Sequence, residues 1–201
     1  MKIKVLLGNF GFGLGVTVIS TIQMIVVTPL LIKEVGATVF GAWVMLADFF
    51  VAMQVFDFGI TAYAAQRIAS EYNRGNLKKV KGNFWASFLL VACLSMLMGI
   101  LGVGLGEFFV KTGGLTAQDV STITACAYIG LVAVGIQLIG YAFIAPSRAL
   151  EKMLSVNVAS FSAAVVGFIS TIYMISAGFG LYSVAYGMLI RSIINLVGGV
   201  W

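Results

Sequence analysis

The sequence predicts an all-α protein that crosses a membrane several times. Of its 201 residues, 61% are hydrophobic and only 9% are charged, and the mean hydropathy is +1.07. A soluble domain is about 45–50% apolar and about 25% charged, so the composition excludes a water-soluble globule. Backbone groups in hydrocarbon must be hydrogen-bonded within the chain, which favours helices. The alternating pattern of an outer-membrane barrel strand is absent.

Six apolar segments are long enough to cross a bilayer as helices. A spanning helix needs about 20 predominantly apolar residues, and the segments of this length cover residues 5–32, 40–65, 84–106, 121–145, 156–177 and 181–201. The first is much longer than the apolar core of a signal peptide, which has about 7–15 residues. No small-residue cleavage site interrupts it, so we expect it to be retained as a membrane span.

The connectors between these segments indicate the orientation of the chain. Cytoplasmic loops carry an excess of Lys and Arg, and six spans would place nine cations on one side: Lys2, Lys4, Arg67, Arg74, Lys78, Lys79, Lys81, Arg148 and Lys152. Only Lys33 and Lys111 would lie on the other side. We therefore expect both ends of the chain to be cytoplasmic. This topology also accounts for the net charge of +5 without nucleic-acid binding.

The most polar connector, residues 66–82, ends in a basic cluster directly before the third span. Lys78, Lys79 and Lys81 would meet the anionic inner leaflet of the membrane. Such a cluster is typical of a topology anchor, and specific recognition of a lipid head group is the alternative.

The residues that usually carry catalysis or bind metals are scarce. The chain contains no His, and its two cysteines, Cys93 and Cys126, both lie within apolar runs. This leaves no zinc-type ligand set, no His general base and no disulfide framework. The loops carry no acidic cluster suited to Mg²⁺. We therefore expect no enzymatic activity, no cofactor and no bound metal.

Ionisable side chains within membrane spans are costly, so they indicate function. One of the three is Arg191, ten residues from either end of the last apolar segment and about 15 Å deep by helical rise. It shares a helix face with Gly187, Asn195 and Gly198. This face should look into the interior of a helix bundle, where the arginine would contact an anionic substrate or form a structural ion pair.

The other two, Asp48 and Asp57, lie on nearly opposite faces of the second span. Asp57 shares a polar face with Gln54 and Thr61, and it could act in function or help to break the helix at Gly59. Asp48 could pair with Arg191 or bind a proton or cation.

The first span also carries a polar line that suggests one face on a cavity. Its members recur at steps of four and then seven residues: Asn9, Gly13, Thr17, Thr21 and Thr28.

Several stretches of the first two apolar segments and of the connection after them form a distinctive pattern. They are Thr28-Pro29-Leu30-Leu31-Ile32, Gly36, Phe40-Gly41, Trp43, Phe56-Asp57-Phe58-Gly59-Ile60 and Ala64-Ala65-Gln66-Arg67-Ile68-Ala69. This pattern resembles the amino-terminal part of Wzx-type polysaccharide and O-antigen flippases, an oligosaccharide flippase family of the multidrug/oligosaccharidyl-lipid/polysaccharide exporter superfamily. Further on, Ala149-Leu150-Glu151-Lys152 and Asn157 resemble the family's second cytoplasmic turn.

The resemblance implies a transporter of two six-helix lobes around a central cavity, of which residues 1–201 would form the first lobe. Such proteins move an undecaprenyl-diphosphate-linked oligosaccharide across the bacterial cytoplasmic membrane by alternating access. The partners of this chain would then be the lipid-linked oligosaccharide, membrane lipids, and a glycan polymerase or other assembly proteins. In the family, cavity arginines contact the anionic substrate, and Arg191 matches them in type and depth. Together with the polar faces described above, this makes Arg191, Asn195, Asp57, Gln54 and Thr17 the candidate substrate-binding residues, and Asp48 and Asp57 the candidate ion-coupling residues.

Two other functions remain open. A cation-coupled multidrug exporter of the same superfamily could use Asp48 and Asp57, although Arg191 argues against cationic substrates. A non-transporting scaffold in a glycan assembly complex would use the charges only to pair and pack.

Overall fold

The chain folds into a bundle of long helices. The computed structural model describes residues 3–55, 59–112, 115–150 and 153–200, and these ranges contain helices and short connections with no strand. The helices are α1 (Ile3–Val35), α2 (Ala37–Val55), α3 (Ile60–Asn73), α4 (Leu77–Thr112), α5 (Ala117–Ala149), α6 (Met153–Ser176) and α7 (Tyr182–Val200). The predicted all-α class is therefore confirmed.

Five stretches are long and apolar enough to cross a membrane: Phe10–Val35, Ala37–Asn73, Leu77–Leu97, Ala117–Ala149 and Met153–Ser176. They correspond to the first five predicted spans, which makes the protein polytopic. The sixth predicted span corresponds to α7, which is 19 residues long.

The second predicted span is not one continuous helix. The hydropathy pattern predicts a single helix over residues 40–65, whereas the structure has α2 ending at Val55 and α3 beginning at Ile60. Gly59, which precedes α3, has a left-handed backbone with φ of 74°. Residues with a Cβ avoid this conformation, whereas glycine adopts it readily. Because a left-handed residue does not belong to a continuous α-helix, α3 begins as a separate helix after Gly59. Residues 56–58, and with them the predicted role of Asp57 in the break, lie outside the described residues.

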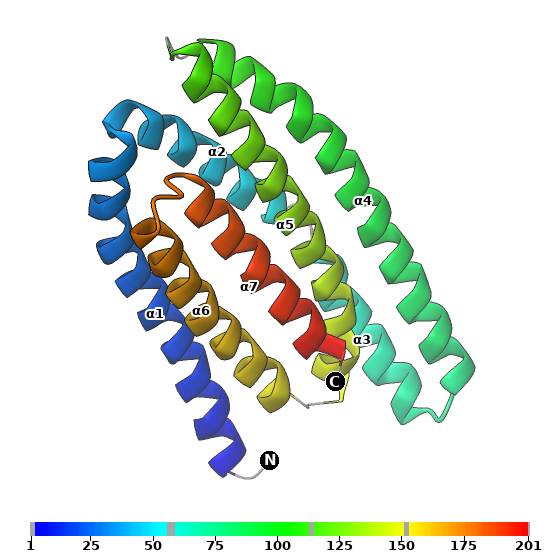
Figure 1. Cartoon of the computed structure of the whole chain (residues 1–201). Coiled ribbons are helices and arrows are strands. Elements are labelled where there is room, and N and C mark those ends of the chain that lie inside the picture. Colours follow the sequence, from blue (N-terminus) through cyan, green and yellow to red (C-terminus); the bar gives the residue numbers. More distant parts are fainter. Residues whose placement is uncertain (1–2, 56–58, 113–114, 151–152, 201) are drawn as a thin grey trace.

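The helices have a simple spatial order (Figure 1). The terminal helix α7 lies between α5 and α6, α1 packs on the far side of α6, and α4 packs on the far side of α5. The helices α2 and α3 both pack against α5. The last helix, α7, is therefore held between α5 and α6, and its outer face, with Tyr186 and Ile193, stays exposed.

The core of the bundle lies between α2, α5 and α7. Its fully buried members include Phe50 and Met53 of α2, Leu138 of α5 and Leu181, which directly precedes α7. Gly130 of α5 lies under the ring of Phe50, where a side chain would not fit. By contrast, the outer faces of α1 and α4 carry many exposed apolar side chains, as expected for surfaces that contact lipid.

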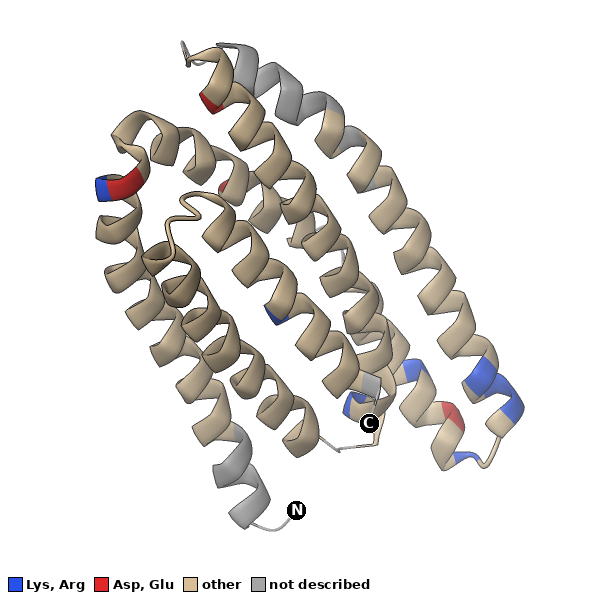
Figure 2. Ribbon diagram, in the orientation of Figure 1, with Lys and Arg blue, Asp and Glu red and all other residues tan. Residues whose placement is uncertain are grey.

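Charged side chains are concentrated at the two ends of the bundle (Figure 2). The basic α3–α4 connection and the end of α5 lie at the same end as the start of α1 and the end of α7. Lys33 and Glu34 belong to the last turn of α1, at the opposite end. The helix order thus brings together the basic segments that the topology prediction assigned to one side of a membrane.

Candidate functional site

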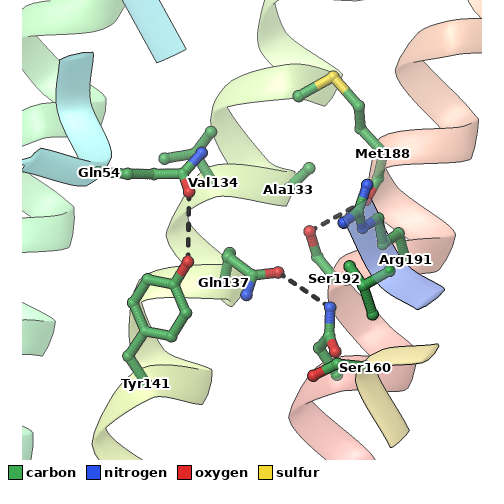
Figure 3. Close-up of a pocket in the computed structure, with 11 residues that line it drawn as sticks. Gln54, Ala133, Val134, Gln137, Tyr141, Ser160, Met188, Arg191 and Ser192 are labelled. Carbon is green, nitrogen blue, oxygen red and sulfur yellow. Dashed lines mark hydrogen bonds between the residues drawn. The ribbon is translucent and has the colours of Figure 1, made fainter. Parts of the chain in front are cut away.

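A polar cavity lies in the middle of the bundle, beside α7 (Figure 3). Its volume is about 360 Å³. Five helices line it: α1 contributes Val16, α2 contributes Gln54, α5 contributes Ala133, Val134, Gln137 and Tyr141, α6 contributes Ser160, and α7 contributes Met188, Arg191, Ser192 and Asn195. The described lining therefore contains one cation, several neutral hydrogen-bonding groups and no carboxylate.

The α6–α7 packing places Arg191 at this cavity. Gly187 lies one turn before Arg191 and faces Thr171 of α6 so closely that no side chain would fit there. A Cβ added at Gly167 of α6 would come 3.3 Å from the Cβ of Arg191. Small residues on both helices thus let the backbones approach, and the stem of Arg191 lies against α6 while its guanidinium borders the cavity.

Five of the neutral polar side chains of the cavity bond to one another or to the backbone. The Tyr141 hydroxyl donates to Gln54 Oε1 at 3.3 Å, and Asn195 Nδ2 donates to Gln137 Oε1 at 3.5 Å. The Ser192 hydroxyl donates to the Met188 carbonyl at 2.9 Å, within α7. These bonds join α2 to α5 and α5 to α7 across the cavity (Figure 3).

Arg191 is the exception, because within the described ranges no carboxylate forms an ion pair with it and no side chain or carbonyl accepts a hydrogen bond from it. A guanidinium presents five N–H donors, and at membrane depth such a group requires an anion, a phosphate or water. The arrangement therefore suits the binding of an anionic group.

A second cavity of about 320 Å³ also borders Arg191. It lies between α1, α2 and α7, and its lining is largely apolar, with Gln23, Thr28 and Trp43 among its members. Of the residues that line the two cavities, Arg191 is the one they share. The arginine therefore lies at the boundary between a polar compartment and a more apolar one.

Three of the predicted site residues come together in the structure. Arg191, Asn195 and Gln54 all line the polar cavity, although Gln54 comes from a helix far from the other two in the sequence. Gly187 and Gly198, which share the Arg191 face, pack against α6. The polar stripe on α7 therefore has two roles, packing through its glycines and lining the cavity through its polar side chains.

The other residues predicted for the site lie away from this cavity or fall outside the described residues. Thr17 is exposed and donates to the Gly13 carbonyl at 3.3 Å, so it does not line the cavity, whereas its neighbour Val16 does. Asp48 is exposed and forms no ion pair with Arg191, so the predicted pairing is wrong for the described chain. Asp57 is not among the described residues.

The sequence interpretation did not select four polar residues that line the cavity: Gln137, Tyr141, Ser160 and Ser192. Gln137 and Tyr141 are four residues apart on α5, which places them on one face. That pattern is equally typical of helix packing, and only the position of α2 and α7 shows which role applies. Ser192 lies three residues before Asn195, at helical spacing, and this pairing with a predicted site residue is the signal that could have marked it.

Comparison with known proteins does not add to this description. No family model, no curated protein and no solved structure matches the chain.

Proposed function

We propose that this chain forms one six-span lobe of a bacterial inner-membrane transporter that moves a lipid-linked oligosaccharide across the membrane by alternating access. The carried molecule would be an undecaprenyl-diphosphate-linked glycan. The observation that carries the proposal is the half-buried Arg191, which lies in a polar cavity in the middle of α7 and lacks an acidic partner among the described residues.

The chemistry of the cavity fits such a head group. A diphosphate offers several anionic oxygens, and the planar guanidinium of arginine binds phosphate through paired, charge-assisted hydrogen bonds. Around it, the amides of Gln54, Gln137 and Asn195 can both donate and accept hydrogen bonds, as sugar hydroxyls require. The cavity thus supports a substrate that is anionic at one point and neutral but polar elsewhere.

Transport would lower the cost of carrying this group through hydrocarbon. A charged, hydrated head group is expensive to move into a medium without hydrogen-bonding partners. Arg191 and the amides would replace its water, while the polyprenyl chain stays in lipid. Movement of this lobe against a second one would expose the cavity to each side of the membrane in turn.

We propose the end of the bundle with the basic α3–α4 connection as the cytoplasmic end, on the positive-inside rule. Asp48 and Asp57 are the proposed coupling groups. Since Asp48 lies outside the polar cavity, it would act on the position of α2 rather than on the substrate directly.

The proposal is tested by Arg191→Ala in the bacterium that makes the glycan. Lipid-linked intermediates should accumulate in the cytoplasmic leaflet, and surface glycan should fall at least tenfold, because a lost charge-assisted pair is worth about 1.5–3 kcal/mol. Arg191→Lys should restore part of the export. The matched control is Arg67→Ala, which removes an exposed arginine at the end of the bundle.

Normal surface glycan in the Arg191→Ala strain, at normal expression, would overturn the assignment. A multidrug exporter would give a different result, namely resistance to cationic dyes on expression that is lost in Asp48→Asn.

A further inference from the structure

A second cavity of interest lies at the basic end of the bundle, away from Arg191. It has a volume of about 300 Å³ and forms where α3, α4, α5 and α7 converge. Its lining comprises Ile68 of α3, Val80, Lys81 and Phe84 of α4, Phe143, Pro146 and Ser147 of α5, and Gly199 of α7. None of these residues lines the polar cavity around Arg191.

The wall of this cavity is largely apolar and includes two aromatic rings, Phe84 and Phe143, with Phe88 and Trp85 packed beside them. The rings of Phe84 and Phe143 have centroids 5.8 Å apart, and Phe88 lies 5.5 Å from Phe143. Trp85 packs on Phe84 at 5.6 Å, and more than half of its surface is exposed. These rings form a surface on which a hydrocarbon chain could lie.

The mouth of the cavity is basic. Lys81 borders it directly, and Lys78 and Lys79 lie on the adjoining first turn of α4. The one described carboxylate at this end of the bundle, that of Glu71, is buried and lies 3.5 Å from Arg74. No described acidic group therefore pairs with Lys81, and this end presents a positive field (Figure 2).

The height of the cavity fits the head-group region of a membrane. Lys81 is in the second turn of α4 and Ser147 is in the last turn of α5, and both helices are candidate spans. Exposed tryptophan is typical of the membrane–water interface, and Trp85 lies one residue from the cavity lining. A phosphate bound at Lys81 would have its acyl chain pointing along the apolar wall toward the middle of the bundle.

We propose that this cavity binds an anionic phospholipid, with its phosphate on Lys81 and the Ser147 hydroxyl and one acyl chain against Phe84 and Phe143. Lys81, in the basic cluster at the start of α4, then forms one half of a built lipid site and is not only a topology anchor. This inference does not depend on the proposed transport function, because it concerns different residues.

The test uses the full chain purified in a nonionic detergent. Because this sample contains no charged membrane surface, the lysines do not attract anionic lipid non-specifically. Native mass spectrometry compares the one-to-one complex with dioleoylphosphatidylglycerol, which is anionic, and with dioleoylphosphatidylcholine, which has the same chains and no net charge. The anionic lipid should bind more tightly. Lys81→Gln should weaken it by about fivefold or more, because one basic residue near anionic lipid is worth about 1 kcal/mol.

The matched control is Lys79→Gln, which removes the same charge from the same cluster without touching the cavity lining, and we expect less than a twofold effect. Ser147→Phe fills part of the cavity while keeping every charge, and it should also reduce binding. Thermal unfolding without added lipid shows whether each variant is folded. Equal binding of the two lipids, or equal losses in Lys79→Gln and Lys81→Gln, would overturn the proposal.

Discussion

At the scale of single residues, Arg191 differs from the other charged side chains by its surroundings. Arg67 reaches the hydroxyl of Tyr63 at 2.9 Å, and Arg74 reaches Glu71, so both have partners near the surface. Arg191 lies half-buried in a cavity where the amides and the phenol are already bonded to other groups. A charge placed in this way costs folding free energy in the free protein, and binding of an anion would offset that cost.

If the unpaired charge of Arg191 costs folding free energy, Arg191→Met should not destabilise the protein. Methionine keeps the length and the packing against α6 but removes the charge. The free energy of unfolding in detergent should stay the same or rise, by at most the 2.5–3.5 kcal/mol that a centred arginine costs in a membrane helix. If Arg191 instead held a structural ion pair, the same variant would lose about 3–5 kcal/mol, because a buried carboxylate would be left alone. Chemical unfolding followed by circular dichroism distinguishes the two results.

At the scale of helices, the contact between α6 and α7 fixes the position of the candidate site. Thr171 is fully buried, its hydroxyl donates to the Gly167 carbonyl at 2.8 Å, and it lies against Gly187. Further along α7, Gly198 faces Ala159 in the same way. The two helices thus pack closely through small residues. This close packing determines the position of the Arg191 side chain beside the cavity.

Gly187→Ala should therefore destabilise the bundle by about 1–3 kcal/mol, the usual cost of adding bulk to a packed site. Gly82 in α4 provides the matched control, since nothing lies within 4 Å of its would-be Cβ. Gly82→Ala should be neutral or stabilising by about 0.5–1 kcal/mol, because alanine is the better helix former. Thermal unfolding of both variants in the same detergent tests the pair, and an equal effect at the two positions would contradict the packing argument.

Hydropathy and helical periodicity predict most of the helices, but they do not predict which helices and side chains pack against one another. The six apolar segments and the clustering of basic connectors follow from the order of apolar and charged residues along the sequence. The interruption of the second span requires a positive φ at Gly59, and hydropathy contains no such information. Periodicity places Thr17 on a polar face of α1, but it cannot show that this face is exposed and that Val16 faces the cavity. Likewise, the depth of Asp48 suggests a partner for Arg191, whereas pairing depends on how α2 and α7 are oriented.

At the scale of the whole molecule, the arrangement separates charge from hydrocarbon. Where their side chains are described, the outer helices α1 and α4 expose many apolar residues, and the polar cavity lies inside, beside α7. The described cations other than Arg191 lie near the two ends of the bundle, mostly at one of them (Figure 2). This asymmetry is the physical basis for the proposed orientation, because a positive end is retained on the cytoplasmic side during insertion.

The orientation predicts which ends can be labelled from outside a cell. In a background with Cys93→Ala and Cys126→Ala, a maleimide that cannot cross the inner membrane should label Lys33→Cys in cells with a permeable outer membrane. It should label Lys79→Cys only after the inner membrane is opened. Both positions are exposed in the structure, so a failure to react reports the membrane barrier and not burial. Labelling of Lys79→Cys in closed cells would contradict the proposed orientation, and the cavity at Lys81 would then face the outer leaflet.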